Sequence, residues 1–410
     1  MWNKCLIQTY NVAKTIWSEA LNTKTILISG ASIAGPSLAY WLSRHGFRPT
    51  VVERAPAIRP GGYAVDFRGA SMQVLERMGI LPEVERVQTR TGATTIVDSA
   101  NRKVASLPDG FTSGEIEVLR GDLARILYEA TRHDAEYIFD DSITALRQNA
   151  ACVEVTFSRS LPRTFDLVVG ADGLHSNVRS LAFGPESQFI RHLGYYVSIF
   201  TVPNHLGLDH SALFHGVPGK MVGIFGAKDN AQATASFYFA SPPLEYDRYD
   251  TAQQQGILRD RFTSMVWEVP RLLQMLDQAP DFYFDSISQI KMPRWSSGRV
   301  ALLGDAAYCG SPLSGMGTGM AVVGACILAG ELKHAAGDAA IAFANYESRM
   351  RDYVARCHKL AEGADWFIPK TRWKLWLRNQ IWRTLPHTPW KNLMLDIPMK
   401  AANSICLQNY

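Results

Sequence analysis

Apolar and polar residues between Thr25 and Arg54 follow a pattern that predicts a strand, a turn, a helix and a second strand. Ile26-Leu27-Ile28 and Val51-Val52 are short continuous apolar runs, as expected for strands buried on both faces of a parallel sheet. Between them lie a glycine-containing turn, Gly30 to Gly35, and a helix-like segment that ends near Gly46. The stretch therefore predicts a βαβ unit.

The turn approaches a G-x-G-x-x-G pattern, with Ser32 in place of the middle glycine. Glycine lets the backbone bend sharply and approach a pyrophosphate closely, at the positively polarised start of the following helix. Glu53 lies 18 residues after Gly35, close to the spacing expected of an acid that binds an adenosine ribose. We predict a dinucleotide site; the alternative is an ordinary βα turn whose glycines serve packing.

Two later segments resemble this first unit. Phe165 to Gly173 is a strand pattern that ends in glycine and acid, and Val300 to Leu303 is another that leads into Gly304-Asp305. The loop that follows, Tyr308 to Gly319, is rich in glycine and delivers an apolar helix from Met320. Such a loop again directs N–H groups and a positive helix end at a site, so we predict a second anion-stabilising element.

Two features between these units leave alternatives open. Gly61-Gly62, followed by a short strand pattern with Asp66, is either a plain loop or a place where backbone approaches a flat ligand. Arg120 lies near the start of a predicted helix. A solvated surface charge is the commoner role for such an arginine, but a cofactor phosphate or ribityl chain would also find its cation there.

From about residue 181 to residue 290 the pattern changes to aromatic-rich strands of a predicted antiparallel sheet. An aromatic sheet is most often a packed face. Because the sheet lies between two parts of a nucleotide-binding unit in the sequence, it is also a candidate for covering a bound substrate. The candidate substrate contacts are Phe214, Phe225, Phe237 and Phe239.

Composition describes an ordinary folded protein of 410 residues, with 47% hydrophobic and 20% charged residues. The six cysteines show no metal-ligand spacing, so we expect reduced thiols in a cytoplasmic protein, no metal site and no nucleic-acid partner. The apolar run Met320 to Gly330 is too short to cross a membrane. Residues 1–24 make a poor signal peptide, and they are either a short docked helix or an extension without functional weight.

The C-terminal tail is basic and rich in tryptophan. Residues 366–410 hold five of the ten tryptophans, seven basic residues and one acid, a net charge of +6 against −2 for the rest of the chain. Trp373, Trp376, Leu377 and Ile381 share one face of a predicted helix. A basic amphipathic helix can lie on membranes or anionic partners, but more often it covers an apolar surface of its own protein.

On these motifs the chain resembles the flavin-dependent class A monooxygenases, which are related to aromatic hydroxylases. The similarity covers roughly Thr25 to Glu347 and rests on three motifs in order, namely the Gly30 to Gly35 turn with Glu53, Asp166 to Gly173, and Gly304 to Ala307 with its loop. Within the family, the chain looks most like the tetracycline-inactivating branch. That likeness rests on Gly61 to Asp66, Tyr196 to His210 and Asp281 to Met292.

The resemblance implies an α/β (α+β two-domain) fold, in which an antiparallel-sheet substrate domain is inserted into a Rossmann-like FAD-binding domain that C-terminal helices follow. The expected divisions are an N-terminal extension (residues 1–24), the discontinuous FAD-binding domain (25–180 and 291–345), the substrate domain (181–290) and the C-terminal helical region (346–410).

The resemblance also implies bound FAD and its contacts. Adenosine would lie at Glu53 and Arg54, Arg120 and Asp305 would serve the diphosphate and ribityl region, and the loop around Gly315 would line the pyrimidine edge of the ring. Many relatives have glutamine where this chain has Met316. The expected cofactor contacts are Gly30, Ser32, Ile33, Ala34, Gly35, Glu53, Arg54, Gly62, Asp66, Arg120, Asp172, Asp305, Pro312, Gly315, Met316, Gly317 and Thr318.

The activity that the resemblance implies is hydroxylation of a bulky phenolic or enolic polycyclic compound by O2, through a flavin C4a-hydroperoxide. NAD(P)H would dock transiently, with Arg59 as a candidate contact, and tetracycline is the specific substrate candidate. Alternatives are polyketide tailoring, a halogenase or reductase on the same scaffold, and a membrane-surface or partner-binding module. No W-x-W-x-I-P stretch supports a halogenase. We assign no catalytic acid or base, and His175 receives no catalytic role.

Overall fold

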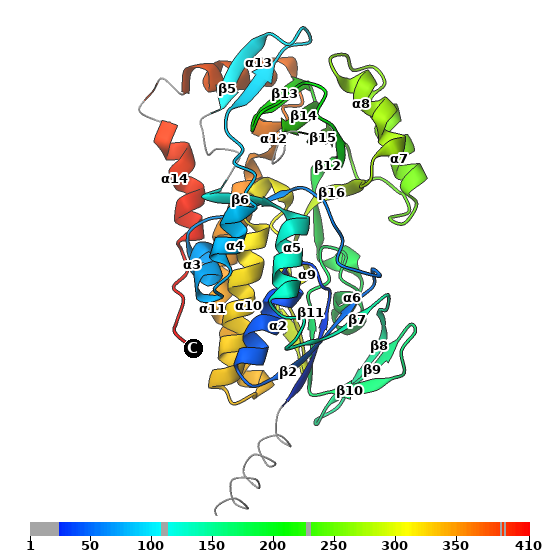
Figure 1. Cartoon of the computed structure of the whole chain (residues 1–410), viewed down its shortest axis with the longest axis vertical. Helices are drawn as coiled ribbons and strands as arrows, with labels where there is room; N and C mark the ends of the chain where they lie inside the picture. Colours follow the sequence, from blue (N-terminus) through cyan, green and yellow to red (C-terminus); the bar gives the residue numbers. More distant parts are fainter. Residues whose placement is uncertain (1–23, 108–113, 227–230, 386–387, 389–390) are drawn as a thin grey trace, which may run out of the picture.

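The computed structural model describes residues 24–107, 114–226, 231–385, 388 and 391–410. Two large sheets lie one above the other along the long axis of the molecule (Figure 1). The expected N-terminal extension therefore lies almost entirely outside the described residues. Within them, every helix is too short or too polar to cross a membrane, and no group of His, Cys, Asp and Glu side chains could hold a metal ion.

The lower sheet contains the predicted βαβ unit. Its strand order is β17-β18-β11-β1-β2-β7, and neighbouring strands are parallel except for the β17–β18 pair. The continuous apolar runs of the sequence are its central strands. The bounds are β1 (Thr25–Ser29), β2 (Arg48–Glu53), β7 (Glu136–Phe139), β11 (Leu167–Gly170), β17 (Ser296–Ser297) and β18 (Val300–Leu302).

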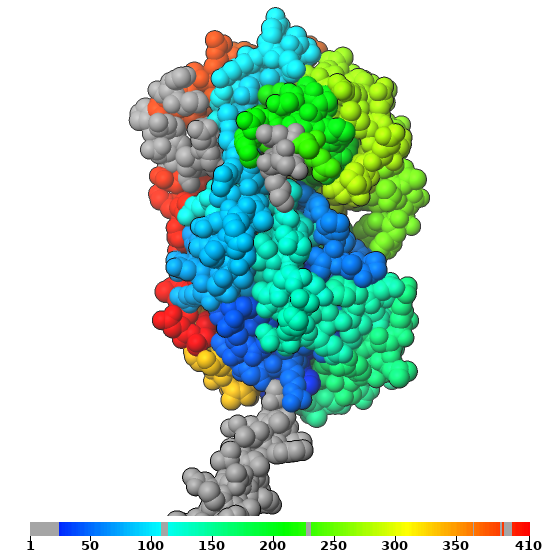
Figure 2. Space-filling model, in the orientation of Figure 1, coloured from blue at the N-terminus to red at the C-terminus, as the bar shows by residue number. Residues whose placement is uncertain are grey.

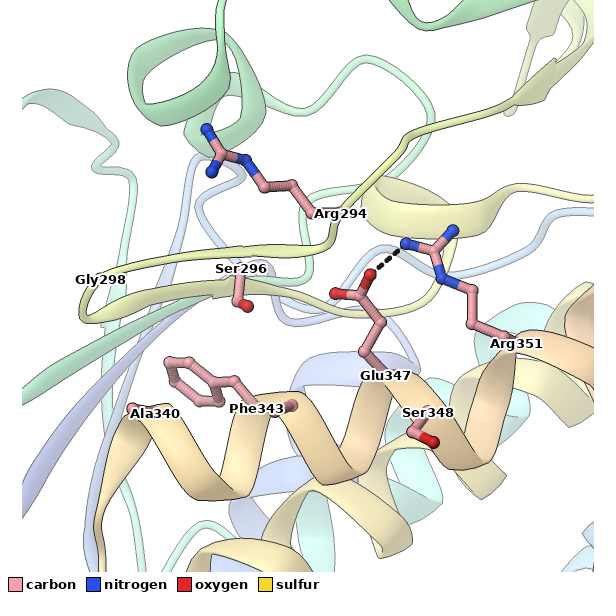
Figure 3. Close-up of a pocket in the computed structure, with 9 residues that line it drawn as sticks. Arg294, Ser296, Gly298, Ala340, Phe343, Glu347, Ser348 and Arg351 are labelled. Atoms are coloured by element: carbon pink, nitrogen blue, oxygen red, sulfur yellow. Dashed lines mark hydrogen bonds and ion pairs between the residues drawn. The ribbon is translucent and has the colours of Figure 1, made fainter.

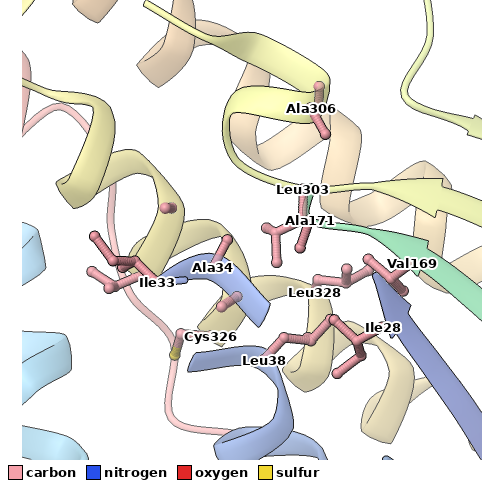
Figure 4. Close-up of a cluster of buried hydrophobic side chains, with 14 of the residues drawn as sticks. Ile28, Ile33, Ala34, Leu38, Val169, Ala171, Leu303, Ala306, Cys326 and Leu328 are labelled. Atoms are coloured by element: carbon pink, nitrogen blue, oxygen red, sulfur yellow. The ribbon is translucent and has the colours of Figure 1, made fainter. Parts of the chain in front are cut away.

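Helices α2 (Ala34–Arg44) and α10 (Gly317–His334) pack against each other beside this sheet. Leu38 of α2, Leu328 of α10 and Ile28 of β1 lie together in a fully buried cluster (Figure 4). Burying each such side chain contributes roughly 1.5–3 kcal/mol. This core holds the starts of both helices beside the ends of the parallel strands.

The upper sheet has seven strands in the order β16-β12-β15-β14-β13-β4-β5. It is antiparallel except for the parallel pair β13–β4. The bounds are β4 (Thr94–Val97), β5 (Lys103–Leu107), β12 (Ile190–Pro203), β13 (Ala212–Val217), β14 (Lys220–Gly226), β15 (Gln232–Ala240) and β16 (Tyr283–Ile290).

Strands β4 and β5 correct the expected division of the chain. The expected division places residues 94–107 in the FAD-binding domain, yet they extend the upper sheet through pairing of Ala212 with Thr94. The alternation of polar and apolar residues in this stretch identifies strands but does not specify their neighbours, because that pairing joins segments more than a hundred residues apart.

Smaller elements complete the fold. The strands are β3 (Ala64–Phe67), β6 (Ile116–Leu119), β8 (Ile143–Gln148), β9 (Val153–Phe157) and β10 (Arg163–Phe165). The helices are α3 (Ala70–Arg77), α4 (Leu81–Arg86), α5 (Arg120–Glu129), α6 (Asn177–Phe183), α7 (Thr251–Phe262), α8 (Val269–Met275), α9 (Asp305–Tyr308), α11 (Ala339–Leu360), α12 (Ala364–Phe367), α13 (Arg372–Thr384) and α14 (Lys391–Ala402). Short 3-10 turns include η3 (Pro312–Ser314).

Helix α13 packs on the upper sheet with a face that the amphipathic pattern did not predict. Trp373 and Trp376 are 64% and 51% exposed, whereas Arg378 and Trp382 are buried. The expectation that the tryptophan face covers an apolar surface of the protein is therefore wrong for these two residues. The cause is tertiary, because Arg378 finds buried acceptors, including the carbonyl oxygen of Phe367 at 2.7 Å.

Candidate functional site

The glycine turn between β1 and α2 is needed for packing as well as for ligand approach. Gly30 has φ +107°, and a Cβ there would lie 2.5 Å from the carbonyl oxygen of Ala171. A Cβ on Gly35 would lie 1.9 Å from the carbonyl oxygen of Gly30. Since side chains cannot fit at either position, these glycines alone do not distinguish a ligand site from a tight turn, and the surrounding polar groups must decide.

Glu53 holds this turn at the end of β2. Its carboxylate oxygens accept hydrogen bonds from the backbone N–H of Ala31 at 2.8 Å and of Ala55 at 3.0 Å. The carboxylate still has lone pairs available for further donors, such as sugar hydroxyls. It lies on a small cavity lined by Ala31, Ser32, Glu53, Ala57, Ile58, Arg59, Arg120 and Ala124.

Arg54 lies outside the residues that line this cavity. Its guanidinium lies 5.6 Å from the ring centroid of Tyr249, and its Nη1 donates to the Tyr249 hydroxyl at 3.4 Å. The structure thus brings Glu53 but not Arg54 onto the cavity wall. A contact between Arg54 and adenosine stays a prediction that this arrangement does not favour.

Arg120 supplies the positive charge of the cavity. It donates to the hydroxyl of Ser32 at 3.2 Å and to the carbonyl oxygens of Arg59 and Gly61, each at 3.3 Å. Burial, together with the neighbouring charge of Arg59, lowers the pKa of Arg120. A guanidinium whose hydrogen bonds in the described part of the chain go to neutral oxygens fits a diphosphate as its counter-ion.

Gly62 makes room for this arginine. It has φ +99°, and a Cβ there would lie 2.8 Å from Nε of Arg120. The N–H of Gly62 donates to a carboxylate oxygen of Asp281 at 3.3 Å. Gly62 therefore acts by making room for Arg120 and by tying its loop to the segment at Asp281, just before β16.

The starts of α2 and α10 lack side-chain caps. The N-cap residues are Ile33 and Met316, and neither side chain accepts a hydrogen bond from its helix. The first N–H groups of both helices are thus available to a ligand with negative charge. This arrangement matches the two anion-stabilising elements that the glycine loops predict.

Asp305 and Asp66 converge on the loop before α10. Oδ1 of Asp305 lies 3.7 Å from the position of a Cβ on Gly317, and Oδ2 of Asp66 lies 3.5 Å from that of a Cβ on Gly315. Burial raises the pKa of Asp305. Burial also raises the pKa of Asp66 to about 7, against the opposing effects of Arg68 and the Gly114 N–H. The structure thus brings Asp66, from a distant segment, to the same loop as Asp305.

A separate hollow of about 530 Å³ lies between α11 and the β17–β18 hairpin (Figure 3). Glu347 and Arg351 pair within it, and the guanidinium of Arg351 lies 4.2 Å from the ring centroid of Trp295. Ser296 and Gly298 of this hollow precede β18, whereas Asp305 and the glycine-rich loop from Tyr308 to Gly319, which we call the cofactor loop, follow that strand. Ligands of such sheets bind beyond the carboxyl ends of the strands, so we assign this hollow no cofactor role.

Comparison with known proteins identifies what binds at the site that Glu53, Arg120 and Asp305 form. The sequence profile of the FAD binding domain family matches residues 23–364. A flavin-dependent monooxygenase from an unknown prokaryotic organism is 44% identical over 337 residues, 81% of this chain and 87% of that protein. A flavin-dependent monooxygenase of Legionella longbeachae is 42% identical over 334 residues, 80% and 85% of the two chains. The chain is a flavin-dependent monooxygenase of this FAD-binding family.

Solved structures place the monooxygenase near one branch of the family. Tetracycline destructase Tet(51) matches with a TM-score of 0.84 and 34% identity over 95% of this chain and 100% of that chain. Tetracycline destructase Tet(55) matches with a TM-score of 0.82 and 39% identity over 95% and 99% of the two chains. The predicted membership in the class A monooxygenases, near the tetracycline-inactivating branch, is confirmed.

Asp172 has a positioning role in the monooxygenase. Its carboxylate accepts hydrogen bonds from the hydroxyl of Ser176 and from the N–H groups of Asn177 at 2.9 Å and Val178 at 3.1 Å. These donors belong to the start of α6, so Asp172 fixes the turn after β11. This geometry does not favour the expected direct contact of Asp172 with the cofactor.

The four candidate phenylalanines separate onto two faces of the upper sheet. Phe214 and Phe225 lie together, with ring centroids 5.1 Å apart, in the cluster that also contains Leu313 of η3. Phe237 and Phe239 lie on the other face, where Phe237 packs 4.9 Å from the ring of Phe262 in α7. Because alternate residues of a strand point to opposite faces, the two pairs cannot line the same surface, and the substrate contacts stay a prediction that the packing of Phe237 and Phe239 against α7 does not favour.

Sequence reasoning missed Tyr238 and Phe367, whose rings are 5.7 Å apart on the same face as Phe225. The two-residue alternation along β15 could have indicated Tyr238, which lies between Phe237 and Phe239. No local signal indicates Phe367, because it comes from α12, far along the chain. The face of the sheet that carries Phe225 thus combines strand residues with a C-terminal one.

His175, which received no catalytic role, links two parts of the chain. Its Nδ1 lies 2.9 Å from Glu186 and its Nε2 lies 3.1 Å from Asp285 in β16. The hydroxyl of Tyr283 donates to Asp285 at 3.3 Å, and the ring of Tyr283 lies 5.6 Å from that of Tyr63. Burial alone would lower the pKa of His175, but hydrogen bonds to Asp285 and Glu186 outweigh it and raise this pKa.

Proposed function

We propose that this monooxygenase uses NAD(P)H and O2 to hydroxylate a bulky phenolic or enolic polycyclic compound, and that tetracycline is such a substrate. The observation that carries the proposal is that Leu313, in the cofactor loop, packs against the apolar cluster that contains Phe214 and against which Phe225 also packs. A flat, apolar ring system suits a site that is bordered by a flavin loop and an aromatic sheet. Similarity to Tet(51) and Tet(55) supports the choice of substrate.

Four side chains and the start of α10 would hold FAD. Arg120 would neutralise the diphosphate, Glu53 would accept hydrogen bonds from the adenosine ribose, and Asp305 would accept them from the ribityl hydroxyls. Asp66 would lie near the ring. The uncapped start of α10 would stabilise negative charge on the pyrimidine edge of the reduced ring. Bound FAD, once reduced by NAD(P)H, supplies the electrons that activate O2.

The aromatic face would bind and orient the substrate. Phe225, Tyr238 and Phe367 offer ring surfaces for stacking and edge contacts. Tyr283 connects this face to the cofactor side through Tyr63, and burial raises the pKa of both hydroxyls. Both tyrosines therefore stay neutral at physiological pH, and since Tyr283 donates to Asp285, the hydroxyl of Tyr63 is the one that would donate a hydrogen bond to an oxygen atom of the substrate.

The test is turnover by purified protein. FAD-loaded protein is mixed with NADPH, tetracycline and air, and the absorbance and mass of tetracycline are followed. We expect NADPH consumption that depends on tetracycline and a product that is heavier by one oxygen atom. Samples without NADPH, and samples without O2, serve as controls.

Two outcomes would contradict the proposal at different levels. Protein that folds but does not bind FAD would overturn the cofactor assignment. Protein that binds FAD and oxidises NADPH but leaves tetracycline unchanged would overturn the substrate. Turnover of an aromatic polyketide in that case would favour a tailoring monooxygenase with the same site.

A further inference from the structure

Helix α13 and the segment before it form an exposed surface that we call the aromatic-basic surface. Trp373 and Trp376 stack with ring centroids 5.0 Å apart and are 64% and 51% exposed, and Trp366 is 53% exposed. Such large apolar side chains are rarely exposed together without a partner. The exposed residues of this surface are Trp366, Lys370, Arg372, Trp373, Lys374, Trp376 and Arg383.

The outward orientation of the tryptophans is fixed by a buried arginine. The guanidinium of Arg378 donates to the carbonyl oxygen of Phe367 at 2.7 Å and to the side-chain oxygen of Asn379 at 2.8 Å, and it lies 4.4 Å from the ring centroid of Trp382. Rotation of α13 to bury Trp373 would expose Trp382 and break these contacts. Because a buried charge without partners is costly, the helix keeps its tryptophans outside.

Positive charge accompanies the exposed rings. Arg372 lies in the first turn of α13 and Arg383 in its last, and both side chains are exposed. Among the described residues of the segment just before α13, the acids are Glu362 and Asp365, and Asp365 already pairs with Lys370 at 3.5 Å and accepts a hydrogen bond from Tyr195. The surface therefore presents a row of indole rings flanked by cations.

We propose that the aromatic-basic surface docks on a membrane leaflet that contains anionic phospholipids. Indole rings favour the region between lipid headgroups and acyl chains, and lysine and arginine favour anionic headgroups. Helix α13 lies at one end of the molecule, far from the β8–β10 sheet at the other end (Figures 1 and 2), so it can reach a flat surface. Full-length monooxygenase would bind the leaflet through α13.

The experiment measures sedimentation of full-length, FAD-loaded protein with vesicles of phosphatidylcholine alone or mixed with phosphatidylglycerol, at physiological salt. We expect binding to the mixed vesicles and little to the neutral ones. The variant Trp373→Gln/Trp376→Gln should lose most of this binding. Arg372→Gln and Arg383→Gln should each weaken it about fivefold, as expected for one cation near an anionic surface.

Leu161→Ser is the matched control, because Leu161 is an 84% exposed apolar residue in the loop between β9 and β10. It should leave vesicle binding unchanged, and circular dichroism with FAD absorbance should verify the fold of every variant. No binding to mixed vesicles, equal binding to neutral vesicles, or equal loss in Leu161→Ser would overturn the proposal. A concentration-dependent dimer that Trp373→Gln/Trp376→Gln abolishes would instead assign the surface to a second copy of the chain.

Discussion

The guanidinium of Arg120 donates a hydrogen bond to the hydroxyl of Ser32 across 3.2 Å. Ser32 occupies the position where the nucleotide-binding pattern usually has its middle glycine. The serine is accommodated because its hydroxyl meets a cation at the cavity rather than an apolar wall. The same contact ties the start of α5 to the turn before α2.

Arg120→Ala should weaken FAD binding about ten- to hundredfold, the loss expected for a hydrogen-bonded charge of about 1.5–3 kcal/mol. Ser32→Gly should change affinity by less than about threefold, since Arg120 keeps its carbonyl partners. Titration of apoprotein with FAD, followed by flavin fluorescence, measures both. Unchanged affinity in Arg120→Ala would remove this residue from the cofactor site.

Asp305→Ala should lose FAD while the protein stays folded, because the carboxylate lies at the loop before α10 and is proposed to bind ribityl hydroxyls. Asp172→Ala should instead lower the free energy of unfolding by about 1–2 kcal/mol, because it removes acceptors for N–H groups at the start of α6. Flavin absorbance and thermal unfolding separate the two effects. Full FAD occupancy in Asp305→Ala would reject the role of Asp305.

Gly30→Ala should destabilise the fold far more than Gly46→Ala. Both glycines have positive φ, +107° and +82°, but only a Cβ at Gly30 meets another atom, the Ala171 oxygen at 2.5 Å. Gly46→Ala should cost about 1–2 kcal/mol for the left-handed backbone alone. Urea unfolding gives both values. Equal decreases in the free energy of unfolding would show that the ends of β1 and β11 move apart easily beside Ala171.

Phe225→Ala should raise the KM for substrate with a small loss of stability, because its ring is partly exposed on the face shared with Leu313. Phe237→Ala should lower the free energy of unfolding by about 3–5 kcal/mol without a specific effect on KM, because its ring is buried against α7. Steady-state kinetics and urea unfolding test the pair. A reversed result would place the substrate on the other face of the sheet.

The raised pKa of His175 predicts a pH dependence of stability. Protonated His175 bonds to Glu186 and Asp285, so its contribution is fully present below its unfolded pKa of about 6.5 and is lost as pH rises through the higher folded pKa. The stability difference between wild type and His175→Gln should therefore shrink as pH rises above about 6.5 and through the raised folded pKa. Urea unfolding across this range measures it. A constant difference would mean that His175 is neutral in the folded protein.

Local constraints made part of this protein predictable from its sequence. A βα turn that approaches a phosphate requires glycines in the turn, here Gly30 and Gly35, and an acid at the end of the next strand, here Glu53. These requirements all apply within one short stretch of the chain. Together with the Gly304-Asp305 loop, they identified the family and the Rossmann-like sheet. Strand alternation also showed that the aromatic segments form a sheet with two faces.

Only the tertiary structure decided which face of that sheet meets the cofactor loop. The alternation of side chains along the strands puts Phe225 and Phe237 on opposite faces, but it does not say which face is which. That is decided by the packing of α7 against one face and of η3 against the other. The same holds for the partners of His175, which come from β16 and the turn at Glu186, and for α13, where Arg378 rather than Trp373 is buried. Local backbone requirements can be recognised from consecutive residues. Which of two similar faces of a sheet or helix becomes buried depends instead on contacts with distant segments.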